Sequence, residues 1–378
     1  GLGARHLLGE LLVSEGWRRA VAVVDPAIVE LPLIEELLED LMRHTDRFGV
    51  VLGPTQEPTY DALEERRLAV SEIAPEAVVG IGGGTALDMA KGLAALVHNG
   101  GPALEYRGWD RMTEPVVPVV AVPTTAGTGS EVTPNASFVD TAEQRKLGIN
   151  GEALRPRYAL LDPELTVSCP TRATVSAAVD SLVHATEAYV AKKSNRLARL
   201  LALEGFRTVF RALPEVVERP DDLKQRVAVM YGAHLAGIAL MHSGTGPAAA
   251  MSYPLGVGYQ VPHGVAGGIF LPHVIQTNVS RGVHAYADFY DAITPGEGHT
   301  SSSTEERANN LIDAMRQMFS DLDVQGDAST YGISRDDLPG LVRDTMELRG
   351  ALEQNPVPFT EEDVERTFLA ALNLPPNE

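Results

Sequence analysis

The sequence predicts an α/β domain with a parallel sheet over residues 1–163, followed by an all-helical domain over residues 164–378. Three observations support this division. A chain of 378 residues is too long for one ordinary core. Its first part alternates short β-branched apolar runs with amphipathic stretches, which is typical of a parallel α/β sheet. After Asp162-Pro163, alanine- and leucine-rich helical periods dominate.

Each element of the first domain has its own signal. The strands are short apolar runs, of which Ala20–Asp25 (AVAVVD) is the first and Phe48–Leu52, ended by Gly53-Pro54, the second. The helices have apolar residues along one face. In chain order we expect strands at 20–25, 48–52, 77–81, 116–122, 136–139 and 158–161, and helices at 28–42, 59–73 and 85–97.

The second domain shows helical periodicity without a convincing strand. Long, mostly buried helices are expected at 173–192, 196–212, 222–241 and 263–280. Prolines and glycines predict breaks at Pro214, at Pro220, and across 244–247 and 254–262. A polar loop is expected from 296 to 304.

Composition excludes several classes of protein. A net charge of −20 argues against nucleic-acid binding, because phosphates would be repelled. No apolar run approaches the length of a membrane span, and no secretory leader opens the chain. The single cysteine, Cys169, cannot form an internal disulfide. We therefore expect a cytoplasmic protein with no membrane partner.

Two glycine-rich loops each follow a predicted buried strand. The first is 80–85 (GIGGGT), which leads into a helix, and the second is 124–130 (TTAGTGS). Glycines let a backbone approach a pyrophosphate, and a helix N-terminus offers free N–H groups to it. Either loop alone fits a plain tight turn equally well. Together, at neighbouring strand ends, they favour dinucleotide binding.

Asp25 ends the first predicted strand, where a carboxylate can accept hydrogen bonds from the adenosine ribose. An aspartate that begins an Asp-Pro turn explains the same residue. In the second domain, Asp180 and His184 are four apart on a predicted helix, so both project from one face. This spacing fits a pair of ligands for a divalent ion, and it also fits a helix-surface hydrogen bond.

Several strings resemble the iron-containing (group III) alcohol dehydrogenases. They occur in that family's order over residues 20–280: GGGTALDMAK (82–91), PTTAGTGSE (123–131), DPELT (162–166), DSLVHATEAY (180–189), PLG (254–256), PHGVA (262–266) and LPHV (271–274). The resemblance implies a dehydroquinate-synthase-like two-domain architecture, a homodimer, and an active site between the domains. It implies NAD or NADP contacts from Gly82, Gly83, Gly84, Thr85, Asp88, Thr124, Thr125, Thr128 and Lys146.

The resemblance also implies a site for Fe²⁺ or Zn²⁺, with ligands Asp180, His184 and His263. The family usually reads His-x-x-x-His-Pro-Leu-Gly before the third ligand, and its first histidine is the fourth ligand. This chain has Ala249 at that position and Tyr253 in place of the second histidine. We expect a three-ligand site of lowered affinity. We also expect a proline-bounded turn that aims Tyr253 at the nicotinamide.

These expectations lead to a hypothesis about function. An NAD(P)-dependent oxidoreductase would interconvert an alcohol and its aldehyde or ketone, with Tyr253 and His263 as catalytic residues. The Gly108-Trp109-Asp110 string and Tyr253 resemble a branch acting on a sugar acid, which hints at a polyol-type substrate. Two alternatives remain: a dehydroquinate-synthase-like cyclase or lyase that uses NAD transiently, and a nucleotide-binding protein that has lost catalysis.

Overall fold

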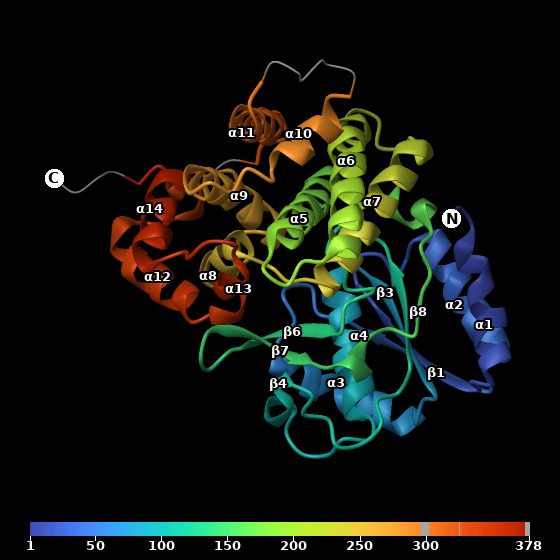
Figure 1. Cartoon of the computed structure of the whole chain (residues 1–378). Coiled ribbons are helices and arrows are strands. Elements are labelled where there is room, and N and C mark those ends of the chain that lie inside the picture. The colour runs from blue at the N-terminus through green and yellow to red at the C-terminus, as the bar shows by residue number, and fades with distance from the viewer. Residues whose placement is uncertain (296–301, 325, 375–378) are drawn as a thin grey trace. The chain divides into compact units, whose positions relative to one another are not determined.

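The computed structural model describes residues 1–295, 302–324 and 326–374 (Figure 1). The chain divides into two compact units, residues 1–169 and 170–378. Most of the polar loop expected at 296–304 lies outside the described residues. Within the described residues, no helix combines the length and apolar character that a membrane crossing demands.

The first unit is built on a five-stranded parallel sheet, which confirms the predicted fold class. Its strand order is β2-β1-β3-β5-β8. The strands are β1 (Arg19–Val24), β2 (Arg47–Leu52), β3 (Ala77–Gly82), β5 (Val119–Pro123) and β8 (Tyr158–Ala159).

Helices cover both faces of this sheet because the side chains of a strand alternate between its faces. On β1, Ala20, Ala22 and Val24 pack in one apolar core with α1 (Leu8–Glu15) and α2 (Pro32–His44). Val21 and Val23 pack in a second core with the helices α3 (Tyr60–Ile73) and α4 (Gly84–Leu96).

A second, three-stranded sheet was not fully predicted. It has the order β4-β7-β6 and consists of β4 (Gly108–Trp109), β6 (Asn135–Asp140) and β7 (Arg145–Asn150). β6 and β7 form an antiparallel hairpin. β6 was predicted and β7 was not, because β7 has only two apolar residues, Leu147 and Ile149, and so short an alternation is a weak strand signal.

The second unit is helical in the residues described, as predicted. Its longest helices pack on one another around α5, which contacts α6, α7 and α9 (Figure 1). The helices are α5 (Thr171–Val190), α6 (Arg196–Glu218), α7 (Leu223–Met241), α8 (Pro247–Tyr259), α9 (His263–Ser280), α10 (Ala287–Ile293), α11 (Thr304–Asp321), α12 (Leu338–Met346), α13 (Arg349–Gln354) and α14 (Glu361–Ala371).

One predicted break is wrong, and the break expected across 254–262 is shorter, at 260–262 between α8 and α9. Pro214 lies inside α6, which continues to Glu218, and Pro254 lies inside α8. A proline within a helix costs roughly 3 kcal/mol through its lost hydrogen bond and ring clash. In α8, complete burial of Met251, Ser252 and Leu255 supports the helix despite that cost.

Candidate functional site

The two glycine-rich loops lie side by side at the carboxyl ends of β3 and β5, which are adjacent strands. Thr124 donates its backbone N–H to the carbonyl of Gly82 at 2.9 Å. A Cβ added at Gly83 would approach Thr125 to 3.3 Å, and one at Gly84 would approach Thr128 to 2.9 Å. Side chains at these two positions would therefore push the loops apart.

Gly82 has a φ of 148°, a conformation that residues with a Cβ rarely adopt. It lets the chain turn from β3 into α4 within two residues. The first turn of α4 has no side-chain cap and no acidic residue. Its N–H groups therefore lack both a capping acceptor and a neighbouring carboxylate, which suits an anion such as a pyrophosphate.

The first loop also lies at the point where the order of the strands reverses, between β1 and β3. From β1 the chain goes to β2 on one side and then crosses to β3 on the other. Ligands of open α/β sheets bind outside the carboxyl ends of the strands at this kind of switch point. Asp25 follows β1 there, and its Cβ lies 2.8 Å from where a Cβ on Gly82 would be.

Asp25 begins the turn that was one of the two roles expected for it. One carboxylate oxygen accepts the N–H of Ala27 at 2.9 Å, which is an Asx turn. The residue is partly exposed beside the glycine loop. The turn fixes the carboxylate in one direction.

Asp88 and Lys91, both in the DMAK string of α4, join the helix to the second loop. Asp88 accepts hydrogen bonds from the Ser130 hydroxyl at 2.6 Å and from the Ser137 N–H at 2.9 Å. Fully buried Lys91 donates to the carbonyls of Thr133 and Asn135, at 3.0 and 2.7 Å. Burial lowers the pKa of Lys91 to about 8, against the opposing effect of nearby carboxylates.

Lys146 lies on β7 of the three-stranded sheet. Its ammonium forms an ion pair with Glu57 at 2.7 Å, and its side chain is mostly buried. A cation held in this way keeps one orientation more firmly than a solvent-exposed lysine would.

In the second unit, Asp180, His184 and His263 come together. Their ligand atoms lie within 4.8 Å of one another. His184 Nε2 is 3.5 Å and His263 Nε2 is 3.8 Å from Asp180 Oδ1. The first two project from α5 one turn apart, and His263 is the first residue of α9.

This donor set suits a divalent ion. Ligand atoms of a tetrahedral zinc site, each about 2.1 Å from the metal, are about 3.4 Å apart. One carboxylate and two imidazoles are also a ligand set found in catalytic zinc sites. Within the described residues, Nδ1 of His184, the nitrogen that does not face Asp180, is buried without a hydrogen-bond partner.

Comparisons with known proteins identify the family. The family model "Iron-containing alcohol dehydrogenase" matches residues 1–163, and the model "Fe-containing alcohol dehydrogenase family, C-terminal" matches residues 174–372. The chain belongs to the iron-containing alcohol dehydrogenases. The predicted family is therefore confirmed, and the protein is an enzyme of the alcohol dehydrogenase class.

Individual relatives cover nearly the whole chain. It is similar to an NAD-dependent methanol dehydrogenase of Bacillus methanolicus, with 29% identity over 98% of this chain and 97% of the relative. Alcohol dehydrogenase 4 of Schizosaccharomyces pombe is 30% identical over 98% of this chain and 86% of its own length. A solved structure of 1,3-propanediol oxidoreductase has 28% identity and a TM-score of 0.92, and covers 98% of this chain and 96% of its own.

Against the family pattern, the departures at Ala249 and Tyr253 lie on one helix, α8. The expected proline-bounded turn at Tyr253 is wrong, because Pro254 continues the helix. The helix instead sets the direction of Tyr253, whose ring meets that of His263 edge-on, with centroids 5.2 Å apart. Ala249 is buried one turn earlier. Its methyl group has no atom that can ligate a metal.

Glu187 is a functional-site neighbour that sequence reasoning missed. It lies seven residues after Asp180, on the same side of α5. Its buried carboxylate accepts N–H groups at the start of α8, from Gly246 and Ala248 at 2.7 Å each. Burial raises the pKa of Glu187 to about 7, although these hydrogen bonds oppose the shift. The i, i+4, i+7 spacing of Asp180, His184 and Glu187 was the available signal.

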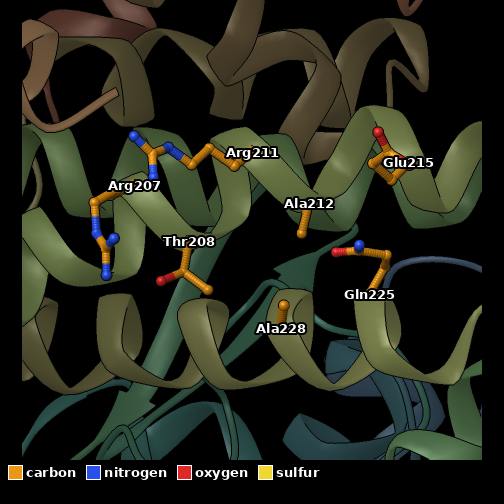
Figure 2. A pocket seen from close by; sticks show the side chains of 7 residues that line it. All are labelled: Arg207, Thr208, Arg211, Ala212, Glu215, Gln225 and Ala228. Atoms are coloured by element: carbon orange, nitrogen blue, oxygen red, sulfur yellow. The ribbon is translucent and has the colours of Figure 1, made fainter. Parts of the chain in front are cut away.

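A separate hollow of about 480 Å³ lies between α6 and α7 (Figure 2). Figure 2 shows side chains from both helices around it. They are those of Arg207, Thr208, Arg211, Ala212, Glu215, Gln225 and Ala228. None of the predicted site residues lines this hollow. Glu204 already pairs with Arg207, at 2.6 Å, so the hollow is not strongly basic.

Proposed function

We propose that the protein is an NAD-dependent oxidoreductase that interconverts a small polar alcohol and its aldehyde or ketone at a metal site formed by Asp180, His184 and His263. The observation that carries the proposal is the convergence of these three ligands within 4.8 Å. A second support is the NAD dependence of the Bacillus methanolicus relative. When bound, NAD supplies the hydride acceptor and iron or zinc supplies a Lewis acid for the substrate oxygen.

We assign the pyrophosphate to the first turn of α4, with the glycine backbone and threonine hydroxyls of the two loops around it. Asp25 accepts hydrogen bonds from the ribose hydroxyls and repels the 2′-phosphate of NADP, which favours NAD. Lys146 lies near the nicotinamide ribose. The residues that contact NAD are Asp25, Gly82, Gly83, Gly84, Thr85, Thr124, Thr125, Thr128 and Lys146. Asp88 acts by holding the second loop, since both its carboxylate oxygens accept protein hydrogen bonds.

Tyr253 exchanges the proton of the substrate hydroxyl in this proposal. Its phenol belongs to a ring held against His263, beside the metal ligands. A phenol O–H can donate to a carbonyl oxygen during reduction and receive the proton of the alcohol during oxidation. The competing role is packing, in which the ring fills the space that a histidine occupies in relatives.

The test begins with NADH formation from a panel of alcohols and polyols, with and without added Fe²⁺ or Zn²⁺. Net metal-dependent turnover is expected. NAD binding without reduction would contradict the proposal and indicate a nucleotide-binding protein. Reduction that is only transient would instead indicate a cyclase or lyase.

The role of Tyr253 is tested by Tyr253→Phe, which removes only the hydroxyl. Proton transfer by this group predicts a fall in kcat of roughly 10²-fold or more with NAD affinity unchanged. Tyr259→Phe is the matched control, because it removes a hydroxyl from the same helix and is expected to retain turnover. Normal turnover of folded Tyr253→Phe would assign Tyr253 to packing alone.

A further inference from the structure

The buried hydroxyl of Ser252 contacts both α8 and the metal ligand of α9. Ser252 has no solvent exposure. Its Oγ lies 2.7 Å from the carbonyl oxygen of Ala249, one turn earlier on α8. The same Oγ lies 3.0 Å from Nδ1 of His263.

The two distances determine which group donates. A serine hydroxyl has one proton and two lone pairs. The Ala249 carbonyl can only accept, and 2.7 Å is the usual length of an O–H···O hydrogen bond. With its proton directed at Ala249, Ser252 Oγ accepts from His263. The 3.0 Å separation is typical of N–H···O, so the His263 proton is on Nδ1.

We propose that Ser252 is a positioning residue that holds His263 in its Nδ1–H tautomer and thereby presents Nε2 as the metal-ligating atom. Nε2 already faces Asp180 Oδ1 at 3.8 Å. The opposite tautomer would place a proton on Nε2 and block ligation there. The metal part of this inference rests on the proposed function, whereas the tautomer is a property of the metal-free chain.

Ser252 is particularly important in a site that has only three protein ligands. Hydrogen bonds to the second nitrogen of a metal-binding histidine orient the ring and fix its tautomer. In the part of the chain that the structure describes, Nδ1 of His184 has no hydrogen-bond partner, although it is buried. Of the two imidazoles, therefore, His263 is the one whose tautomer, and hence whose ligating nitrogen, is fixed by a hydrogen bond before the metal binds.

Nitrogen NMR of metal-free, ¹⁵N-histidine-labelled protein at about pH 8.5, where imidazoles are mostly neutral, tests the tautomer. The His263 signal is assigned by its absence from His263→Asn. A protonated Nδ1 and bare Nε2 are expected in the wild type. In Ser252→Ala the two tautomers should both be populated, and Ser252→Thr should restore the wild-type pattern. A bare Nδ1 in the wild type would overturn the proposal.

Zinc binding to the same variants tests the consequence. Loss of such a partner typically weakens metal affinity about 10- to 100-fold, and this loss is expected for Ser252→Ala. Ser181→Ala is the matched control, because the Ser181 hydroxyl donates to the Ala178 carbonyl at 2.6 Å and is equally buried. Equal affinity of Ser252→Ala and Ser181→Ala would refute the ligand-orienting role. A wild type that binds no zinc contradicts the proposed metal site, while the NMR result still decides the tautomer.

Discussion

Restoring a histidine at position 249 should strengthen metal binding by a modest factor. Four-ligand zinc sites provide about 10–16 kcal/mol, or about 3 kcal/mol per ligand. Ala249 is 4% exposed, so an imidazole there must displace packed neighbours at a cost of about 2 kcal/mol. The remaining gain of about 1 kcal/mol predicts roughly fivefold tighter zinc binding for Ala249→His.

Competition with a coloured chelator measures this difference, and Co²⁺ absorption reports the number of ligands. Ala250→His is the matched control: position 250 is equally buried but lies about 100° around the helix. If folded Ala249→His gains no more affinity than Ala250→His, position 249 is not the missing ligand site. One tightly held metal per wild-type chain, as isolated, would refute the reasoning that three ligands hold the ion weakly.

Three further outcomes are expected. Asp25→Gly should relax a preference for NAD over NADP in steady-state kinetics, and a wild type that prefers NADPH would contradict the ribose assignment. Burial lowers the pKa of Lys91 to about 8, so the folded state loses this proton at a lower pH than the unfolded state does. Denaturant titrations compare the free energy of unfolding of the wild type with that of Lys91→Met. The wild-type value minus the variant value should rise by about 3 kcal/mol between about pH 8 and 10.5, and a difference that stays constant with pH would refute this. Gly264→Ala should lower the Tm by several degrees, because its Cβ would come within 1.8 Å of the Ser176 carbonyl, whereas Gly258→Ala, with open space around it, should not.

The sequence predicted most strands and helices because their signals are local. β1, β3 and β5 are apolar runs buried on both faces, and the chain marks their ends with Asp25 and with glycine or threonine loops. α8 could not be predicted by the same rules. Pro254 is a local signal for a break, while the burial of Met251 and Leu255 that supports the helix comes from tertiary packing.

The candidate site was predicted in part. Asp180 and His184 have helical spacing, but their meeting with His263 depends on how α9 packs against α5. The family resemblance indicated His263 as the third ligand, whereas helical periodicity could not indicate it. The hydrogen bond between Ser252 and His263 and those that Glu187 accepts were missed because they join residues 11 and at least 59 apart along the chain. Sequence spacing carries no signal for such pairs.

The attachment of α4 to the second glycine loop has a consequence for how a nucleotide binds. Asp88 and Lys91 tie the helix to residues 130–137 through four hydrogen bonds with serine, threonine and asparagine groups, at 2.6 to 3.0 Å. The end of the second loop and the segment after it are thus held against α4 before a ligand arrives. Little chain entropy is lost on association, so more of the contact energy remains as affinity. Calorimetry of NAD binding should then show the small heat-capacity change of a surface that does not refold.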